Sequence, residues 1–249
     1  TLDHLGENVA DPEAAARAAA ATVTALNRIA ESGVDSNVSI KLTQMGLDFS
    51  EDLCLSHVRR ILDTAARHGN FVRIDMEGSA YTERTLALYH SLRELGYSNV
   101  GVVIQSYLYR SQSDVAKLIA EGARVRLVKG AYNEPPSLAF PRKRDVDANF
   151  LRLAESLLLQ GNYPAIATHD ERIIAWTERF AAEHGIGRER FEFQLLYGIR
   201  RDLQQRLARQ GYNVRVYVPY GDEWYGYLMR RLAERPANLF FVLANLLRP

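Results

Sequence analysis

The stretch Gly96-Tyr-Ser-Asn-Val100-Gly-Val-Val-Ile-Gln105 decides the fold of this chain, because its outline recurs along the whole sequence. Gly96 ends a helix-like pattern, since a glycine just past a helix takes the left-handed conformation that other residues resist. The run from Val100 to Gln105 is short and rich in β-branched residues, as a buried parallel strand should be. This order of glycine and apolar run predicts a repeated unit of one helix and one strand.

Seven glycines close such helical patterns, namely Gly33, Gly69, Gly96, Gly122, Gly161, Gly185 and Gly211. The strand-like runs that follow them are 38–41, 71–75, 100–105, 125–128, 165–168, 191–195 and 214–218. With residues 1–5 as a first strand, the chain has eight β/α units in about 250 residues. We therefore predict an α/β protein in which residues 1–249 form a single (β/α)8 TIM barrel.

Several predicted helices have recognisable starts. Asp11, Pro12 and Glu13 supply a capping residue, a first-turn proline and an early acid, in that order. Ser50 and Thr82 are each followed by acids and predict two further caps. An open doubly wound sheet is the main rival fold, but no glycine-rich dinucleotide fingerprint follows an early strand.

Composition narrows the class of protein. The net charge of +1 argues against a general nucleic-acid binder. A single cysteine, Cys54, excludes a disulfide framework and indicates a reducing, cytoplasmic location. The histidines show no paired ligand spacing, so we expect no metal site. No apolar stretch reaches the roughly 20 residues needed to span a bilayer. We expect segment 239–247 to be a packed core helix, with peripheral docking on the inner face of the plasma membrane as the alternative.

Polar side chains lie at the predicted carboxyl ends of the strands, where barrels of this type carry their chemistry. They are Asp3, Glu7, Lys41, Asp75, Glu77, Gln105, Arg126, Lys129, Thr168, His169, Gln194 and Tyr217. Strand exits into loops explain some of them. Lys41, Arg126 and Gln194, however, lie within or beside apolar runs, where a charge or an amide is costly unless it is partnered. These strand ends predict a functional site.

The segment Arg126-Leu-Val-Lys-Gly-Ala-Tyr132 is the sharpest local motif. Strand alternation sends Arg126 and Val128 to one face. Gly130 allows close approach of the backbone to a ligand, and Lys129 adds a second cationic donor. The pattern suits a phosphate, a Schiff base or an isoalloxazine ring.

An arginine pair, Arg230 and Arg231, follows the last predicted strand on a helix that begins after Gly221. Adjacent guanidinium groups suit a carboxylate or a phosphate, although a solvated helix face is the ordinary interpretation of such a doublet. Arg230 lies roughly two turns, about 10 Å, into this helix. To reach a substrate, the last helix must therefore lie over the carboxyl-terminal mouth of the barrel.

Taken in order, these residues resemble the proline dehydrogenase family. The resemblance rests on Lys41, Ile74-Asp75, Val103-Ile-Gln105, Arg126-Leu-Val-Lys-Gly-Ala-Tyr132, Ala167-Thr168-His169, Phe193-Gln-Leu-Leu-Tyr-Gly198, Tyr217 and Arg230-Arg231. It implies a barrel that binds FAD, oxidises L-proline to 1-pyrroline-5-carboxylate and passes electrons to a membrane quinone. No segment here is left for the aldehyde dehydrogenase domain of larger relatives, so we expect the monofunctional bacterial type, with a barrel excised from a longer protein as the alternative.

The resemblance also implies roles for single residues. Substrate binding falls to Glu7, Lys41, Tyr217, Arg230 and Arg231. Catalytic roles fall to Asp75, which would orient the cationic site, and to Arg126, which would stabilise negative charge on the reduced flavin. Cofactor binding falls to Met76, Gln105, Arg126, Val128, Lys129, Gly130, Ala131, Tyr132, Thr168, His169, Gln194 and Tyr197. Glu7 would pair with Arg230 as a lid over bound substrate.

The implied reaction is hydride transfer from the ring carbon beside the proline nitrogen to flavin N5. The proline ammonium must first lose a proton, and we expect positive charge around the site to lower its pKa.

Two other functions fit the residues alone. The first is a Schiff-base lyase or aldolase barrel with Lys41 or Lys129 as nucleophile and Asp75 as base. The second is a non-catalytic barrel used as a binding module, for which the polar strand ends have no purpose.

Overall fold

The computed structural model describes residues 1–221. The helices are α1 (Pro12–Ser32), α2 (Glu51–Arg67), α3 (Ser79–Glu94), α4 (Ser111–Ala120), α5 (Lys143–Gln160), α6 (Glu171–Glu183), the 3-10 turn η1 (Arg188–Arg190) and α7 (Arg201–Arg209). The strands are β1 (Leu2–His4), β2 (Val38–Ile40), β3 (Val72–Ile74), β4 (Val100–Gln105), β5 (Arg124–Val128), β6 (Ala165–Ala167), β7 (Glu192–Leu196) and β8 (Asn213–Tyr220).

The strands follow one another around a closed sheet in chain order, from β1 to β8. The pairs resolved in register are parallel, and β8 closes the ring by pairing with β1, Leu2 opposite Val218. This closed order confirms the predicted (β/α)8 TIM barrel and excludes the open doubly wound sheet.

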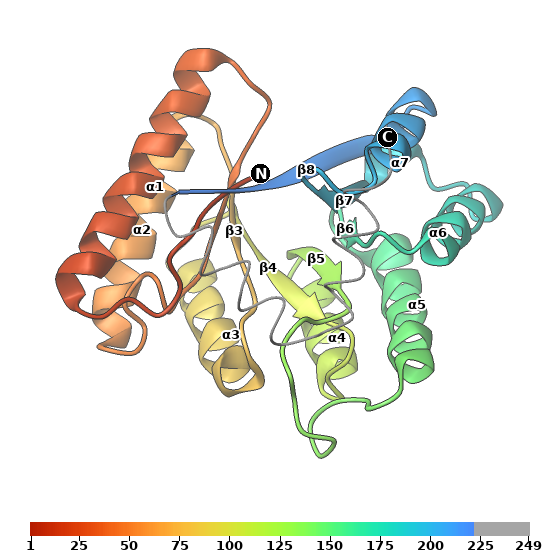
Figure 1. Ribbon diagram of the computed structural model, residues 1–249, viewed down its shortest axis with the longest axis horizontal. Coiled ribbons are helices and arrows are strands. Elements are labelled where there is room, and N and C mark those ends of the chain that lie inside the picture. The colour runs from red at the N-terminus through yellow and green to blue at the C-terminus, as the bar shows by residue number, and fades with distance from the viewer. Residues whose placement is uncertain (222–249) are drawn as a thin grey trace. The chain divides into compact units, whose positions relative to one another are not determined.

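The described chain groups into two compact units. The first contains Thr1–Val102 and residues 218–221, and so holds β1, β2 and β3 with α1, α2 and α3. The second contains Val103–Tyr217, and so holds β5, β6 and β7 with α4 to α7 (Figure 1). A single domain over residues 1–249 stays a prediction.

Two of the predicted helix caps form and one does not. The Asp11 carboxylate accepts a hydrogen bond of 2.7 Å from the Ala14 amide at the start of α1, and the Ser50 hydroxyl caps α2. The prediction at Thr82 is wrong, because α3 already begins at Ser79. Thr82 lies four residues before Leu86 on the buried face of α3, so packing rather than capping fixes its side chain.

The helix-closing glycines also behave as predicted, with one exception. Positive φ angles occur at Gly33, Gly69, Gly96, Gly122, Gly185 and Gly211. Gly161 instead has a φ of −79° and an extended ψ of 165°. Glycine is needed there for a different reason, since an added Cβ would lie 2.5 Å from the carbonyl oxygen of Leu157.

Strand alternation sorts the side chains of β2 and β3 onto two faces. Val38, Ile40, Val72 and Ile74 are buried, and in a β/α barrel such positions face the surrounding helices. Lys41 and Asp75 continue the opposite face of these two strands, and both are buried as well. The face opposite the helices therefore carries ionisable groups at the carboxyl ends of the strands.

Candidate active site

Lys41 lies in the first unit beside three carboxylates. Its Nζ atom is 2.9 Å and 2.8 Å from the two carboxylate oxygens of Asp3, 3.4 Å from Oδ2 of Asp75 and 3.7 Å from Oε1 of Glu7. Lys41 is 4% exposed and Asp3 is 0% exposed. One buried ammonium thus faces three acids supplied by β1, the β1–α1 loop and the end of β3.

The surroundings of Lys41 keep it protonated. Burial by itself lowers the pKa of this amine, but the charges of Asp3, Asp75 and Glu7 outweigh burial and raise the pKa above its ordinary value. A Schiff-base nucleophile requires a neutral amine. The cluster therefore disfavours a lyase or aldolase that uses Lys41.

Glu77 is a second unusual acid in the first unit. Its side chain is buried and accepts hydrogen bonds from Thr43, of 3.1 Å from the amide and 2.5 Å from the hydroxyl. Burial raises the pKa of Glu77 to about 7, even though both bonds from Thr43 lower it. Glu77 is among the polar strand ends in the sequence, but no pattern there gives it a role.

Of the other residues predicted for this part of the site, the structure describes Met76 but not Arg230 or Arg231. Met76 is buried between Asp75 and Glu77 in the chain. Arg230, Arg231 and the last helix lie outside the described residues, so the excess of positive charge around the substrate stays a prediction. Around Lys41 itself, the described residues place three carboxylates against one ammonium.

Arg126 and Tyr217 meet in the second unit. Arg126 is buried in β5, and its guanidinium carbon lies 5.3 Å from the centre of the Tyr217 ring. Stacking of this kind stabilises a cation against the aromatic face. It also fixes the orientation of both side chains.

Lys129 is held between two aspartates of the second unit. Its Nζ atom is 2.6 Å from Oδ1 of Asp147 and 2.7 Å from Oδ2 of Asp170. Burial alone would raise the pKa of both acids, but hydrogen bonds from Lys129 and the nearby charge of Lys143 lower it. This pairing disfavours Lys129 as a nucleophilic amine.

The backbone after Lys129 is shaped by a glycine. Gly130 has a φ of +112°, and an added Cβ would lie 2.6 Å from the Tyr107 ring. The residues of this segment are all half-buried, namely Val128, Lys129, Gly130, Ala131 and Tyr132. The segment thus presents main-chain and side-chain groups without being closed off from solvent.

Thr168 and His169 follow β6, and His169 is hydrogen-bonded to the end of β7. Nε2 of His169 accepts the Leu196 amide at 3.0 Å, so the ring proton is on Nδ1. Burial and then the charge of Arg200 lower the pKa of His169 to about 4, which keeps the ring neutral. The Thr168 hydroxyl accepts the amide of Asp170 at 3.1 Å.

Gln105, Gln194 and Tyr197 are the remaining residues of the second unit that were predicted to bind the cofactor. Gln105 and Gln194 are buried, and Oε1 of Gln194 accepts no hydrogen bond from the described residues. Tyr197 is 61% exposed. A neutral imidazole, two amides and two cations form a donor set that suits a polar, anionic cofactor.

Three acids of these clusters had no predicted role. Asp3 is among the predicted polar strand ends but without a role, and Asp170 directly follows Thr168-His169, so position could have found it as well. Asp147 lies within α5, where nothing in the local sequence separates it from a solvated acid. No group of three or more histidine, cysteine or acidic side chains able to hold a metal ion occurs within residues 1–221.

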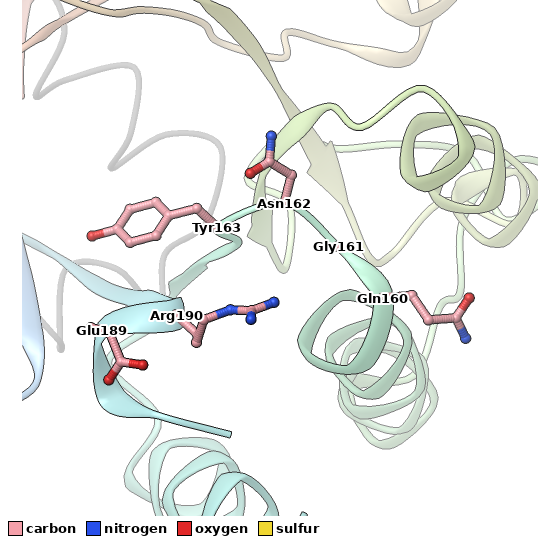
Figure 2. Close-up of a pocket in the computed structure, with 6 residues that line it drawn as sticks. All are labelled: Gln160, Gly161, Asn162, Tyr163, Glu189 and Arg190. Carbon is pink, nitrogen blue, oxygen red and sulfur yellow. The ribbon is translucent and has the colours of Figure 1, made fainter. Parts of the chain in front are cut away.

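A separate pocket of about 380 Å³ in the second unit is lined by Gln160, Gly161, Asn162, Tyr163, Glu189 and Arg190 (Figure 2). The Arg190 side chain points toward the turn at Gly161 (Figure 2). These residues precede β6 and β7, so they lie at the amino ends of those strands. Within the second unit they are therefore at the opposite end of the strands from Thr168, His169 and Gln194.

The sequence contains two further arginine doublets, Arg59-Arg60 and Arg200-Arg201, within the described residues. Arg59 and Arg60 are exposed on α2. Arg200 pairs with Glu171 at 2.5 Å and with Asp202 at 2.8 Å.

Among the described helices, none has the length and apolar character that a membrane span requires.

Comparisons with known proteins agree over the whole chain. A family model described as proline dehydrogenase matches residues 1–244. The chain is 48% identical over 248 residues to proline dehydrogenase 1 of Bacillus subtilis (strain 168), covering 100% of this chain and 82% of that protein. It is 46% identical over 251 residues to proline dehydrogenase of Deinococcus radiodurans, covering 99% of this chain and 81% of that protein.

A solved structure is similar as well. Proline utilization A (PutA) from Bdellovibrio bacteriovorus, inactivated by N-propargylglycine, superposes with a TM-score of 0.84 at 28% identity. The match covers 93% of this chain and 29% of that one. This chain therefore spans less than a third of the length of that PutA protein.

Proposed function

We propose that this chain, which belongs to the proline dehydrogenase family, oxidises L-proline to 1-pyrroline-5-carboxylate with a bound FAD. The observation that carries the proposal is the family match across residues 1–244. We also propose that electrons pass to a quinone and that the protein is cytoplasmic, with peripheral contact to the inner face of the membrane.

Lys41 is the proposed anchor for the substrate carboxylate, together with Arg230 and Arg231. Its raised pKa supports this role, because charge-assisted hydrogen bonds need a permanent ammonium. Asp3 and Asp75 hold the ammonium in place from two sides. Tyr217 is the proposed face for the pyrrolidine ring.

The hydrogen-bonding groups of the second unit fit a flavin. Gln194 has a buried oxygen that accepts no hydrogen bond from residues 1–221, and His169 is neutral with its proton on Nδ1. The bound flavin would supply the hydride acceptor of the reaction. Arg126 would stabilise the negative charge that develops on the ring, and its stacking on Tyr217 fixes the guanidinium for that purpose.

The absorbance spectrum of the purified protein tests this proposal. We expect a flavin spectrum that L-proline bleaches without oxygen. Arg126→Met should slow the bleaching, whereas Arg124→Met, the same substitution two residues earlier on β5, should not. A colourless protein that gains no flavin on reconstitution with FAD would refute the proposed function.

A further inference from the structure

We infer that Glu77 is a positioning residue that acts through Thr43 and Gln44 to hold the β1–α1 loop, and with it Glu7, beside Lys41. The structural part of this inference stands on the contacts of the first unit alone. Its kinetic part rests on the proposed function.

Glu77 is joined to the β2–α2 loop by two hydrogen bonds from one residue. The Thr43 amide donates to Oε1 at 3.1 Å, and the Thr43 hydroxyl donates to Oε2 at 2.5 Å. Glu77, Thr43 and Gln44 are 3%, 1% and 2% exposed. Buried hydrogen bonds of this kind fix the β2–α2 loop, because water cannot replace either partner.

The β2–α2 loop in turn holds the β1–α1 loop on both sides of Glu7. The Gln44 side-chain amide donates to the His4 carbonyl at 2.9 Å. The Asn8 amide donates to the Thr43 hydroxyl oxygen at 3.4 Å. A hydroxyl has one proton and two lone pairs, so Thr43 donates to Glu77 and accepts from Asn8 at the same time.

The backbone around Glu7 depends on these contacts. Gly6 has a φ of +138° and Asn8 a φ of +56°, and the left-handed region is unfavourable for a residue with a side chain. A Cβ added at Gly6 would lie 3.1 Å from the Gln44 side-chain nitrogen. Contacts from the neighbouring loop therefore select this conformation, and they place Oε1 of Glu7 3.7 Å from Nζ of Lys41.

Glu7 is the proposed lid residue, so a loosened loop should weaken proline binding more than the chemical step. Thr43→Val removes the hydroxyl, so Asn8 loses its acceptor and Glu77 keeps only the hydrogen bond from the Thr43 amide. We expect the KM for proline to rise about fivefold, which corresponds to the loss of one net hydrogen bond, while kcat changes by less than about twofold. Amide hydrogen exchange of residues 6–8 should accelerate by at least about fivefold.

Two control variants separate positioning from general damage. Thr43→Ser keeps the hydroxyl and should restore both the KM and slow exchange. Thr22→Val removes a buried hydroxyl from α1, where it donates to the Ala18 carbonyl at 3.0 Å. Thr22→Val should leave the KM and the exchange of residues 6–8 unchanged.

A double-mutant cycle with Glu7→Ala completes the test. If Thr43 acts through Glu7, Thr43→Val adds no further rise in KM when Glu7 is already alanine. An equal rise in both backgrounds would overturn the inference, as would unchanged exchange of residues 6–8 in Thr43→Val. Wild-type protein that does not oxidise proline would refute the proposed function instead, and the exchange experiment would still decide the structural part.

Discussion

Glu77 makes the stability of this protein depend on pH in a predictable direction. Burial raises the pKa of its carboxyl from the ordinary value of 4.5 to about 7. Each pKa unit corresponds to about 1.4 kcal/mol, so this rise is worth about 3 kcal/mol. The folded protein keeps the proton up to about pH 7, whereas the unfolded chain releases it near 4.5.

The sign follows from which state holds the proton. The unfolded state binds fewer protons than the folded state between pH 4.5 and about 7, so the free energy of unfolding falls as the pH rises through this window. The stabilising contribution is complete below about pH 4.5 and is lost above about pH 7. Glu77→Gln cannot ionise and should lack this component.

Urea unfolding of the wild type and of Glu77→Gln at a series of pH values measures the effect. We expect the stability of the wild type relative to Glu77→Gln to fall by about 2–3 kcal/mol between pH 5 and pH 8. Glu94→Gln, which removes an exposed carboxyl from the last turn of α3, should give a flat difference. A flat difference for Glu77→Gln, or one that rises with pH, would refute the reasoning.

The remaining predictions concern four other residues. Lys41→Met leaves the fully buried Asp3 beside no ammonium and should lower the free energy of urea unfolding by about 3–5 kcal/mol; a loss below about 1 kcal/mol would contradict the ion-pair assignment. Gly130→Ala combines a positive φ with contact against Tyr107 and should lower stability by about 1–3 kcal/mol and release FAD, whereas Gly122→Ala, which meets open space, should keep the cofactor. Arg231→Met should raise the KM for proline by at least about tenfold while the protein stays yellow; an unchanged KM would rule out the carboxylate clamp. His169 should not make FAD retention depend on pH between 5 and 8, because its pKa of about 4 keeps the ring neutral. FAD retention on gel filtration should therefore follow the same pH profile in the wild type and in His169→Gln.

Much of the fold could be predicted from short stretches of sequence. Asp11 and Ser50 cap helices as expected, and six glycines take the left-handed conformation, because caps and turns depend on neighbours within a few residues. Thr82 departed from prediction because tertiary packing places it on a buried helix face. Gly161 departed from it for a local reason, since it is extended rather than left-handed and adjoins the carbonyl of Leu157, four residues earlier.

The residues of the candidate site were likewise predicted only in part. Strand-end position identified Lys41, Asp75 and Arg126, since parallel strands place their carboxyl ends on one side of the sheet. Asp147 could not be assigned to Lys129, because it reaches that ammonium from α5, whereas Asp170 lies in the loop directly after β6, where strand-end position could have found it. Glu77 has no distinguishing sequence pattern, since its unusual pKa arises from burial and from Thr43.

The sequence by itself determined the order of strands and helices, the number of β/α units and the set of polar strand ends, because periodicity and glycine placement act locally. Only the tertiary structure decided which charges meet. Asp3 is 38 positions from Lys41 along the chain, yet it is the closest acid to that ammonium. Charge and pKa depend on distance in space and on exclusion of water, and the chain acquires both only when its strands are paired.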